Sequence, residues 1–530
     1  MIGLTIGLAL MGAVASADDS APRLHIRAQS DRVDVAYVLT APTSSFRFDE
    51  PLPLQADVSS PDETLVLTPE GVTSDQAFAA FILSLGPDRA RMDARYPVLT
   101  RLGEGWMIYL PALIGTSEPA LGDIVVEGAE GWSLVGGPGA NPLDGFVYIG
   151  PHRGSADEAR MIADPELPGW LIADTREALR LSTTFYARVL ETPPPGEPAL
   201  FVGLLPPGDR LSHAGDMTQN GVINLQFNQQ FVSVSRDVRF TDLITGFVAH
   251  EVFHVWQGDR YRDQPGINGR WLNEGAAEYF SLLAQAEASG DDEAMRLTLA
   301  GHLNRCVDIM AEHGGGLLQL TGAAAQSTRY SCGAVAQWMA DAALQESGGV
   351  AAIWRRLLSA EGGYDVADFR SLVTDVSGVN ALLDGAPGIE GEVVGSLQRQ
   401  GVRVELGDPG PDAWSIAALW PLLQSTCDGQ MGVFTDEHRY HLDTGDRCGL
   451  LSGDPEAIAI EGHILAEQSE AAFDAVEAAC ATAGAVRVTL KQGDDPREVS
   501  VTCEAAAERP KARYQLSSAL IMSNISHNIS

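Results

Sequence analysis

The segment His250-Glu251-Val252-Phe253-His254 decides how this chain of 530 residues is interpreted. It is an H-E-x-x-H pattern within a run whose apolar residues recur at helical spacing. Residues four apart on a helix lie on one face, so the two imidazoles can bind the same metal ion. Zinc held by such ligands keeps an open position for water, and Glu251 lies beside it as a general base.

A second motif follows at residues 271–279 (WLNEGAAEY). Glu274 comes 20 positions after His254 (254 to 274) and lies on a second predicted helix. A carboxylate from that helix completes a His/His/Glu set and leaves one coordination position for catalysis. Glu278 is one turn further along the same face, where it can accept the second ring N–H of a ligand histidine. A solvated helix charge is the alternative for Glu278.

The motifs lie in a region that the sequence predicts to be mainly helical. Thr241 or Asp242 is expected to cap the helix that ends near Gln257. Strands are expected in front of it at 199–204 and 221–227, and helices at 273–289, 293–312, 331–345, 351–360 and 366–376.

The segments HEVFHVWQG and WLNEGAAEYF resemble the gluzincin metallopeptidases, which include thermolysin, aminopeptidase N and the glycyl aminopeptidase family. The resemblance covers about residues 240–335 and implies a thermolysin-like catalytic domain with one Zn²⁺ per chain. It implies His250, His254 and Glu274 as metal ligands and Glu251 as the base, in a peptidase that hydrolyses peptide bonds with zinc-bound water.

Two further segments relate to that family. Tyr330-Ser331-Cys332-Gly333-Ala334 is similar to its Tyr-x-x-Gly-Ala segment, which implies that Tyr330 stabilises the oxyanion. An ordinary buried aromatic residue is the alternative. Aminopeptidase N-like enzymes carry Gly-x-Met-Glu-Asn on an edge strand, whose glutamate binds the substrate's amine. The corresponding place here is taken to be 221–226 (GVINLQ), which has no acid.

The predicted fold class is α+β with several domains. Short alternating runs at 32–40 and 64–67, punctuated by Pro and Gly, predict a β-rich N-terminal domain over 18–154, interrupted by a helix at 74–85. The mainly helical catalytic domain is expected at 155–385, a small α+β domain at 392–507 and a frayed tail at 508–530. Within the small domain, 449–503 resembles the second half of a PDZ domain, and a generic α+β domain is the alternative.

The N-terminus and the cysteines both point to export. Residues 1–17 combine an apolar run with Ala15-Ser16-Ala17, as a signal peptide and its cleavage site do. Six cysteines without a C-x-x-C pair favour disulfides in a periplasmic or extracellular protein. Sequential pairing is expected because neighbouring cysteines fall within one predicted domain, although 15 connectivities are possible and buried thiols are the alternative. A Cys306–Cys332 bridge would hold Tyr330 in position.

The formal net charge is −36, from 71 acidic and 35 basic residues. Such a field disfavours nucleic acid and anionic membranes as partners, and no stretch other than the N-terminal one approaches the length of a membrane span. The expected partner is a peptide or protein substrate. The competing hypothesis is a non-catalytic envelope protein that binds peptides or proteins and retains a structural zinc site.

Overall fold

The computed structural model describes residues 23–48, 51–52, 58–88, 96–115, 123–136, 145–151, 161–196, 198–205, 213–218, 220–233, 235–236, 238–385, 387–428, 431–436, 438–492 and 495–518. The predicted signal peptide lies outside these residues. The chain divides into two compact units, Met1–Asp291 with Leu344–Thr374, and Asp292–Ala343 with Asp375–Ser530. Each unit is described by itself.

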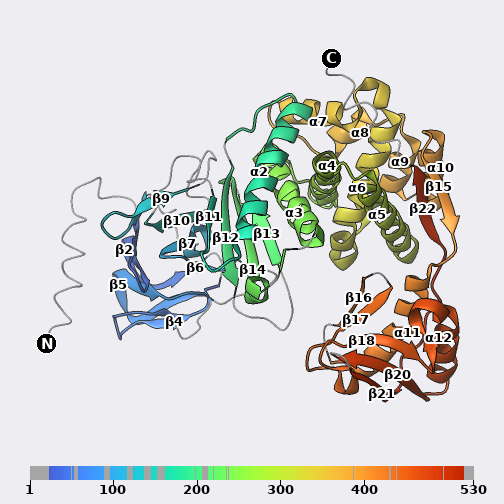
Figure 1. Ribbon diagram of the computed structural model, residues 1–530. Coiled ribbons are helices and arrows are strands. Elements are labelled where there is room, and N and C mark those ends of the chain that lie inside the picture. Colours follow the sequence, from blue (N-terminus) through green and yellow to red (C-terminus); the bar gives the residue numbers. More distant parts are fainter. Residues whose placement is uncertain are drawn as a thin grey trace. The chain divides into compact units, whose positions relative to one another are not determined.

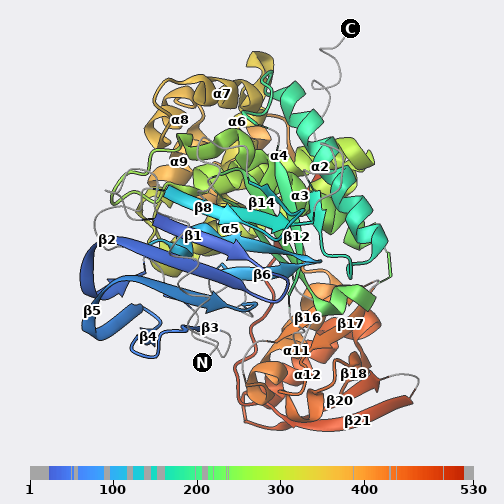
Figure 2. The same cartoon turned by 90° about the vertical axis from the view of Figure 1, so that its left-hand side faces the viewer.

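The N-terminal part of the first unit is β-rich, as predicted (Figures 1 and 2). One sheet has the strand order β3-β5-β2-β1-β8, with β4 paired to β5, and a second has the order β6-β7-β10-β9. Figure 2 shows β8, β1, β2 and β5 side by side. The strands are β1 (Arg23–Ala28), β2 (Val33–Arg47), β3 (Val58–Ser59), β4 (Val66–Thr68), β5 (Gly71–Leu85), β6 (Leu99–Leu102), β7 (Gly105–Tyr109), β8 (Asp123–Glu127), β9 (Ser133–Val135) and β10 (Phe146–Gly150).

The helix predicted at 74–85 is wrong, because these residues belong to strand β5. The segment is rich in Ala and Leu, which favour a helix in isolation. In the folded protein it pairs antiparallel with β2, and Phe81, Leu83 and Leu85 alternate into the core. Tertiary pairing therefore outweighs the local helix propensity.

A third sheet in this unit has the order β11-β12-β14-β13. Strand β14 pairs parallel with β12 and antiparallel with β13, and all seven of its residues are buried. The assignment of 221–226 to the sheet edge is therefore wrong, because β14 has a hydrogen-bonded neighbour strand on each side. The edge is β13. The bounds are β11 (Met161–Ala163), β12 (Ala199–Leu205), β13 (His213–Met217) and β14 (Val222–Asn228).

The helices of this unit follow the predicted pattern with shifted ends. Helix α3 begins at Val238, before the predicted cap, and the Thr241 hydroxyl instead donates to Asp174 of α2. Helix α4 ends at Gly290, whose φ of 68° suits a residue without a side chain. The helices are α2 (Gly169–Val189), α3 (Val238–Gln257), α4 (Arg270–Ser289), α7 (Gly349–Ser359) and α8 (Val366–Leu372).

The second unit combines helices with two sheets. Helix α6 begins nine residues before its predicted start (322 against 331), so Tyr330 lies inside the helix. Residues 513–518, predicted as part of a frayed tail, form strand β22 paired with β15. The elements are α5 (Asp292–His313), α6 (Gly322–Ala343), α9 (Ser377–Asp384), α10 (Ile389–Arg399), β15 (Arg403–Gly407) and β22 (Arg513–Ser518).

Residues 411–503 form a single antiparallel sheet, in the order β16-β17-β18-β20-β21, with two helices packed against each other. The likeness to a PDZ domain stays a prediction. The elements are α11 (Pro411–Thr426), β16 (Gly432–Asp436), β17 (Arg439–Asp443), β18 (Glu456–Ile460), β19 (His463–Ile464), α12 (Leu465–Cys480), β20 (Ala485–Gln492) and β21 (Asp495–Thr502).

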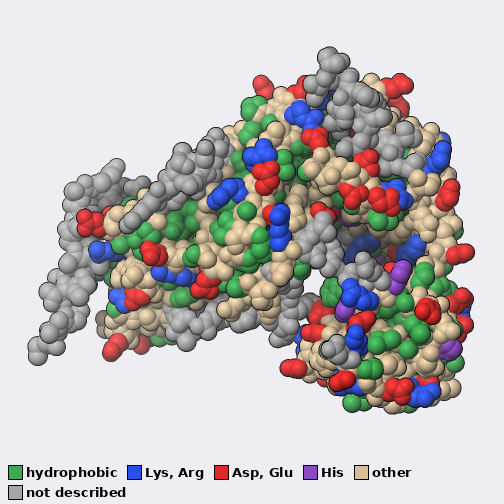
Figure 3. All heavy atoms as spheres, viewed as in Figure 1, with side chains coloured by type: hydrophobic (Ala, Val, Ile, Leu, Met, Phe, Trp, Pro, Cys, Tyr) green, Lys and Arg blue, Asp and Glu red, His purple; other side chains and the backbone are tan. Residues whose placement is uncertain are grey.

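Sequential disulfide pairing is confirmed: Cys306–Cys332, Cys427–Cys448 and Cys480–Cys503 are bonded. The predicted fold class is confirmed as well, since a β-rich N-terminal region precedes a mainly helical part in a mixed α/β multidomain chain. Among the described residues, no helix is both long and apolar enough to cross a membrane. Acidic side chains are scattered across the face in Figure 3 rather than gathered in one patch.

Candidate metal centre

Two neighbouring helices carry the predicted site. Helix α3 bears the H-E-x-x-H segment, and α4 bears the two glutamates of the second motif. The rings of Phe253 and Phe280 stack between these helices, with centroids 4.5 Å apart. The Tyr186 hydroxyl of α2 donates to the carbonyl of Ala249, directly before the first histidine of the motif, at 2.9 Å. Buried aromatic packing thus fixes the helices on which the polar side chains stand.

His250, His254 and Glu274 come together as a group that can hold a metal ion, with one ligand atom each within 4.8 Å of the others. The two Nε2 atoms are 3.3 Å apart, and Glu274 Oε2 lies 3.3 Å from Nε2 of His250 and 3.6 Å from Nε2 of His254. Ligand atoms at about 2.0–2.1 Å from a tetrahedral zinc are separated by about 3.3 Å. The donor set and its spacing therefore fit zinc.

Glu278 lies on the outer side of this group. Its Oε2 atom is 3.2 Å from Nδ1 of His250, the ring nitrogen opposite the one that faces Glu274. A carboxylate in this position holds the ring and increases the basicity of the coordinating nitrogen. The contact is the one that the sequence predicts for Glu278, and its role in metal binding stays a proposal.

Glu251 is the most enclosed of the acidic side chains in the site. Its exposed fraction is 5%, and its Oε2 atom has no hydrogen-bond partner among the described residues. Burial raises the pKa of Glu251 to about 7, although the neighbouring His250 and His254 oppose the shift. A buried carboxyl that exchanges a proton near neutral pH has the properties of a general base.

The pKa values of His250 and Glu274 are shifted in opposite directions. Burial would lower the pKa of His250, but hydrogen bonds to Glu274 and Glu278 outweigh it and hold that pKa well above its usual value. Burial would raise the pKa of Glu274, but its contacts with the two imidazoles hold it well below the usual range. The site thus keeps the charged carboxylate of Glu274 between two histidines. A metal cation can take the place of the histidine protons as the partner of this carboxylate.

Sequence reasoning missed Asp216, which lies on the edge strand β13. Its carboxylate accepts a hydrogen bond from the Tyr96 hydroxyl and is exposed to solvent. Although the residue is exposed, neighbouring groups remove part of the hydration of its carboxyl group, which raises the pKa of Asp216; the nearby Glu274 adds to this, while Tyr96 and His254 oppose it. The pairing with β14 is what identifies β13 as an edge strand. The sequence of 221–226 contains nothing that points to β13 or to Asp216.

Tyr330 belongs to the second unit and lies on α6 with 44% of its side chain exposed. The Cys306–Cys332 bridge joins α5 to α6 two residues from it. The oxyanion role of Tyr330 stays a prediction.

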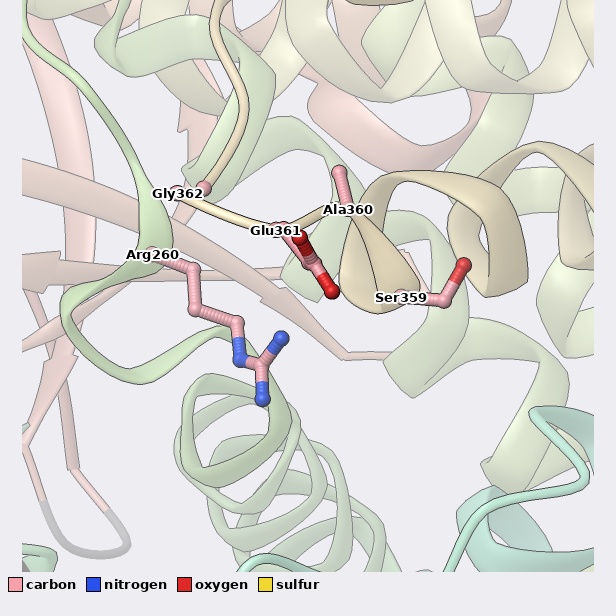
Figure 4. Close-up of a pocket in the computed structure, with 6 residues that line it drawn as sticks. Arg260, Ser359, Ala360, Glu361 and Gly362 are labelled. Atoms are coloured by element: carbon pink, nitrogen blue, oxygen red, sulfur yellow. The ribbon is translucent and has the colours of Figure 1, made fainter.

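A cavity of about 460 Å³ lies elsewhere in the first unit, at the turn that follows α7 (Figure 4). Arg260 and Glu361 supply its charged side chains. The Arg260 guanidinium donates to the carbonyl of Leu358. One of its N–H groups is therefore already used within the protein and is not available to a ligand in the cavity. None of the metal-site residues lines this cavity. Its lining is Arg260, Ser359, Ala360, Glu361, Gly362 and Gly363.

The sequence matches no protein-family model and no curated protein. The structure is similar to that of an aminopeptidase N family protein from Idiomarina loihiensis, at 11% identity over 94% of this chain and 98% of that chain, with a TM-score of 0.48. It is also similar to a variant of an M1 zinc metallopeptidase from Deinococcus radiodurans, at 16% identity over 71% of this chain and 93% of that chain, with a TM-score of 0.37.

Proposed function

We propose that this protein is a zinc-dependent peptidase that hydrolyses peptide bonds. The observation that carries the proposal is the grouping of His250, His254 and Glu274 around one point, with the buried carboxyl of Glu251 directly after His250 in the chain. Three ligands leave one position open to water and substrate. A purely structural zinc has no use for Glu251, whose buried Oε2 atom has no hydrogen-bond partner among the described residues and therefore costs stability.

Hydrolysis adds water across the C–N bond of the substrate. Glu251 accepts a proton from water as the water oxygen attacks the carbonyl carbon. It then delivers that proton to the nitrogen of the leaving amine as the C–N bond breaks. A bound zinc ion supplies Lewis acidity, which lowers the pKa of water and polarises the carbonyl oxygen. Donation from the phenol of Tyr330 to the oxyanion belongs to the same proposal, on the sequence pattern alone.

The edge strand β13 supports a peptide as the substrate. An extended peptide can add to an exposed sheet edge through main-chain hydrogen bonds. Asp216 on this strand is close enough to the ligands that His254 and Glu274 both affect its pKa. Its carboxylate would attract a positive group, such as the free α-amine of a peptide. Removal of N-terminal residues is therefore the favoured mode of cleavage.

Export is the expected location of the activity. The three disulfides fit an oxidising compartment, such as the periplasm or the extracellular space. The signal-peptide pattern ending in Ala15-Ser16-Ala17 agrees with this expectation.

The test compares wild type with Glu251→Gln on a mixed peptide library, with zinc content measured for both proteins. We expect both to hold zinc and the variant to lose at least about 100-fold in rate, the usual contribution of a general base. The termini of the products separate trimming from internal cleavage. Full activity of the variant, or no cleavage by zinc-loaded wild type, would contradict the proposal, and the second result would favour a peptide-binding protein.

A further inference from the structure

Gln257 is the last residue of α3 and lies one turn beyond His254. Its exposed fraction is 1%. The side-chain oxygen Oε1 is 2.5 Å from Nδ1 of His254, and the side-chain nitrogen Nε2 donates to the backbone carbonyl of Asn273 at 3.1 Å. Both ends of this buried amide therefore have partners, on two different helices.

The two contacts fix the proton on the imidazole. A backbone carbonyl can only accept a hydrogen bond, so the NH₂ group of Gln257 must face Asn273 and its oxygen must face the ring. Nδ1 of His254 then carries the hydrogen, because an amide oxygen offers no donor. A neutral imidazole has only one N–H. Nε2 is therefore left with its lone pair, facing Nε2 of His250 and Oε2 of Glu274.

The same amide also joins the two helices that carry the ligands. Asn273 precedes the ligand Glu274, and its side-chain oxygen accepts a hydrogen bond from the Tyr364 hydroxyl at 2.9 Å. Tyr364 is fully buried, so Asn273 near the start of α4 is held by a second hydrogen bond from a fixed side chain. A change at Gln257 would therefore disturb the ring of His254 and the backbone next to Glu274 together.

We propose that Gln257 is a positioning residue of the metal centre, which sets the tautomer and orientation of His254 and holds α3 against the start of α4. The inference rests on the proposed function, since it assumes that the three-residue group binds zinc. The two histidines then have unlike outer partners, because His250 contacts the carboxylate of Glu278 and His254 contacts a neutral amide. Partners of this kind contribute about 10–100-fold to metal affinity.

The experiment measures zinc affinity by competition with a chromophoric chelator, using the full chain. Gln257→Met keeps the length of the side chain but removes both polar atoms, and we expect it to weaken zinc binding about 10–100-fold. Gln257→Glu keeps an acceptor for the ring but loses the donor to Asn273, so it should recover part of the affinity. Gln285→Met is the matched control, the same change on α4 at a half-buried residue outside the metal-ligand group, and should bind zinc like wild type.

The outcomes separate this inference from the proposed function. Zinc binding by Gln257→Met within about threefold of wild type would overturn the positioning role and leave the peptidase proposal intact. Failure of wild type to bind zinc would overturn the proposed function and this inference with it. If Gln257→Met unfolds, the test of the positioning role uses Gln257→Glu instead. The measurement is then the visible absorption spectrum of this variant loaded with Co²⁺. A spectrum like that of wild type supports a held ring, and loss of the tetrahedral bands contradicts the role that we assign to the acceptor oxygen.

Discussion

Two carboxyl groups of the site, those of Glu251 and Glu274, have opposite electrostatic surroundings. Glu274 contacts two imidazoles, which lower its pKa, while Glu251 is buried without a hydrogen bond to its Oε2 atom and has a pKa of about 7. Groups whose surroundings shift their pKa values apart take different roles in catalysis. The permanently charged Glu274 suits a metal ligand, and Glu251 suits proton transfer.

At the same scale, Asp216→Asn tests the recognition of a positive substrate group. The change keeps the shape of the side chain and removes its charge. We expect kcat/KM for peptides with a free N-terminus to fall about 10-fold or more, since hydrogen bonds to charged groups contribute about 1.5–3 kcal/mol. N-acetylated peptides should be affected much less. The measurement is kcat/KM for matched free and acetylated peptides.

The control for this prediction is Asp242→Asn, which removes one exposed carboxylate from α3 outside the metal-ligand group. It should leave both kinds of peptide unaffected. An equal fall for free and acetylated peptides in Asp216→Asn would contradict amine recognition and would favour a structural role for the Tyr96 contact.

At the scale of elements, the turn after α7 supports the start of α4. The backbone N–H of Tyr364 donates to the carbonyl of Arg260 at 2.8 Å, and its hydroxyl donates to Asn273. Gly363 has a φ of +83°, and a Cβ there would come within 2.1 Å of the Arg260 carbonyl oxygen. Only glycine allows this close approach of two backbones.

Gly363→Ala should therefore destabilise the protein and weaken zinc binding. Its neighbour Gly362 has a φ of +82° and nothing within 4 Å of its added Cβ. Gly362→Ala thus carries only the cost of a positive φ, about 1–2 kcal/mol, and serves as the matched control. Thermal unfolding and chelator competition measure the two effects. Equal zinc affinity in both variants would show that the turn does not act on the metal centre.

The Cys306–Cys332 bridge acts on the pair α5 and α6. It closes a separation of 26 residues, and removal of such a crosslink costs about 3 kcal/mol through the entropy of the unfolded chain. We expect the double variant Cys306→Ala, Cys332→Ala to lower the free energy of unfolding, measured with urea, by that amount. Wild type treated with a reductant provides the comparison. A double variant as stable as the oxidised wild type would contradict a stabilising role.

At the scale of the whole molecule, charge is the dominant feature. The chain carries 71 acidic and 35 basic residues, and acidic side chains are spread over the face shown in Figure 3. Self-repulsion of a net charge of −36 opposes the compact state, and salt screens it over about 10 Å at 0.1 M.

Raising NaCl from about 0.02 to 0.5 M should therefore stabilise the protein. We expect Tm to rise by about 2–4 °C, the shift that 1 kcal/mol produces in a domain of about 200 residues. Choline chloride at the same ionic strength should act alike, because screening does not depend on the cation. A Tm that falls, or one that responds to a single cation only, would contradict self-repulsion as the cause.

The sequence by itself determined which side chains form the candidate site and most of its local structure. His250, His254 and Glu274 are recognisable because their spacing on helices is set by the helix repeat, which is a local property. The strands at β12 and β14 and the helices α3 and α4 were predicted for the same reason. Sequential pairing of the cysteines followed from their division among the predicted domains.

Only the tertiary structure decided which strands are edges and which side chains meet the site from a distance. The segment 74–85 became strand β5 through pairing with β2, and β13 became the edge because β14 is paired on both sides. Asp216 reaches the site through this pairing, and Gln257 gains its role from Asn273 on another helix. Such contacts depend on packing between segments that are distant in the sequence. The periodicity of apolar residues within one segment carries no information about them.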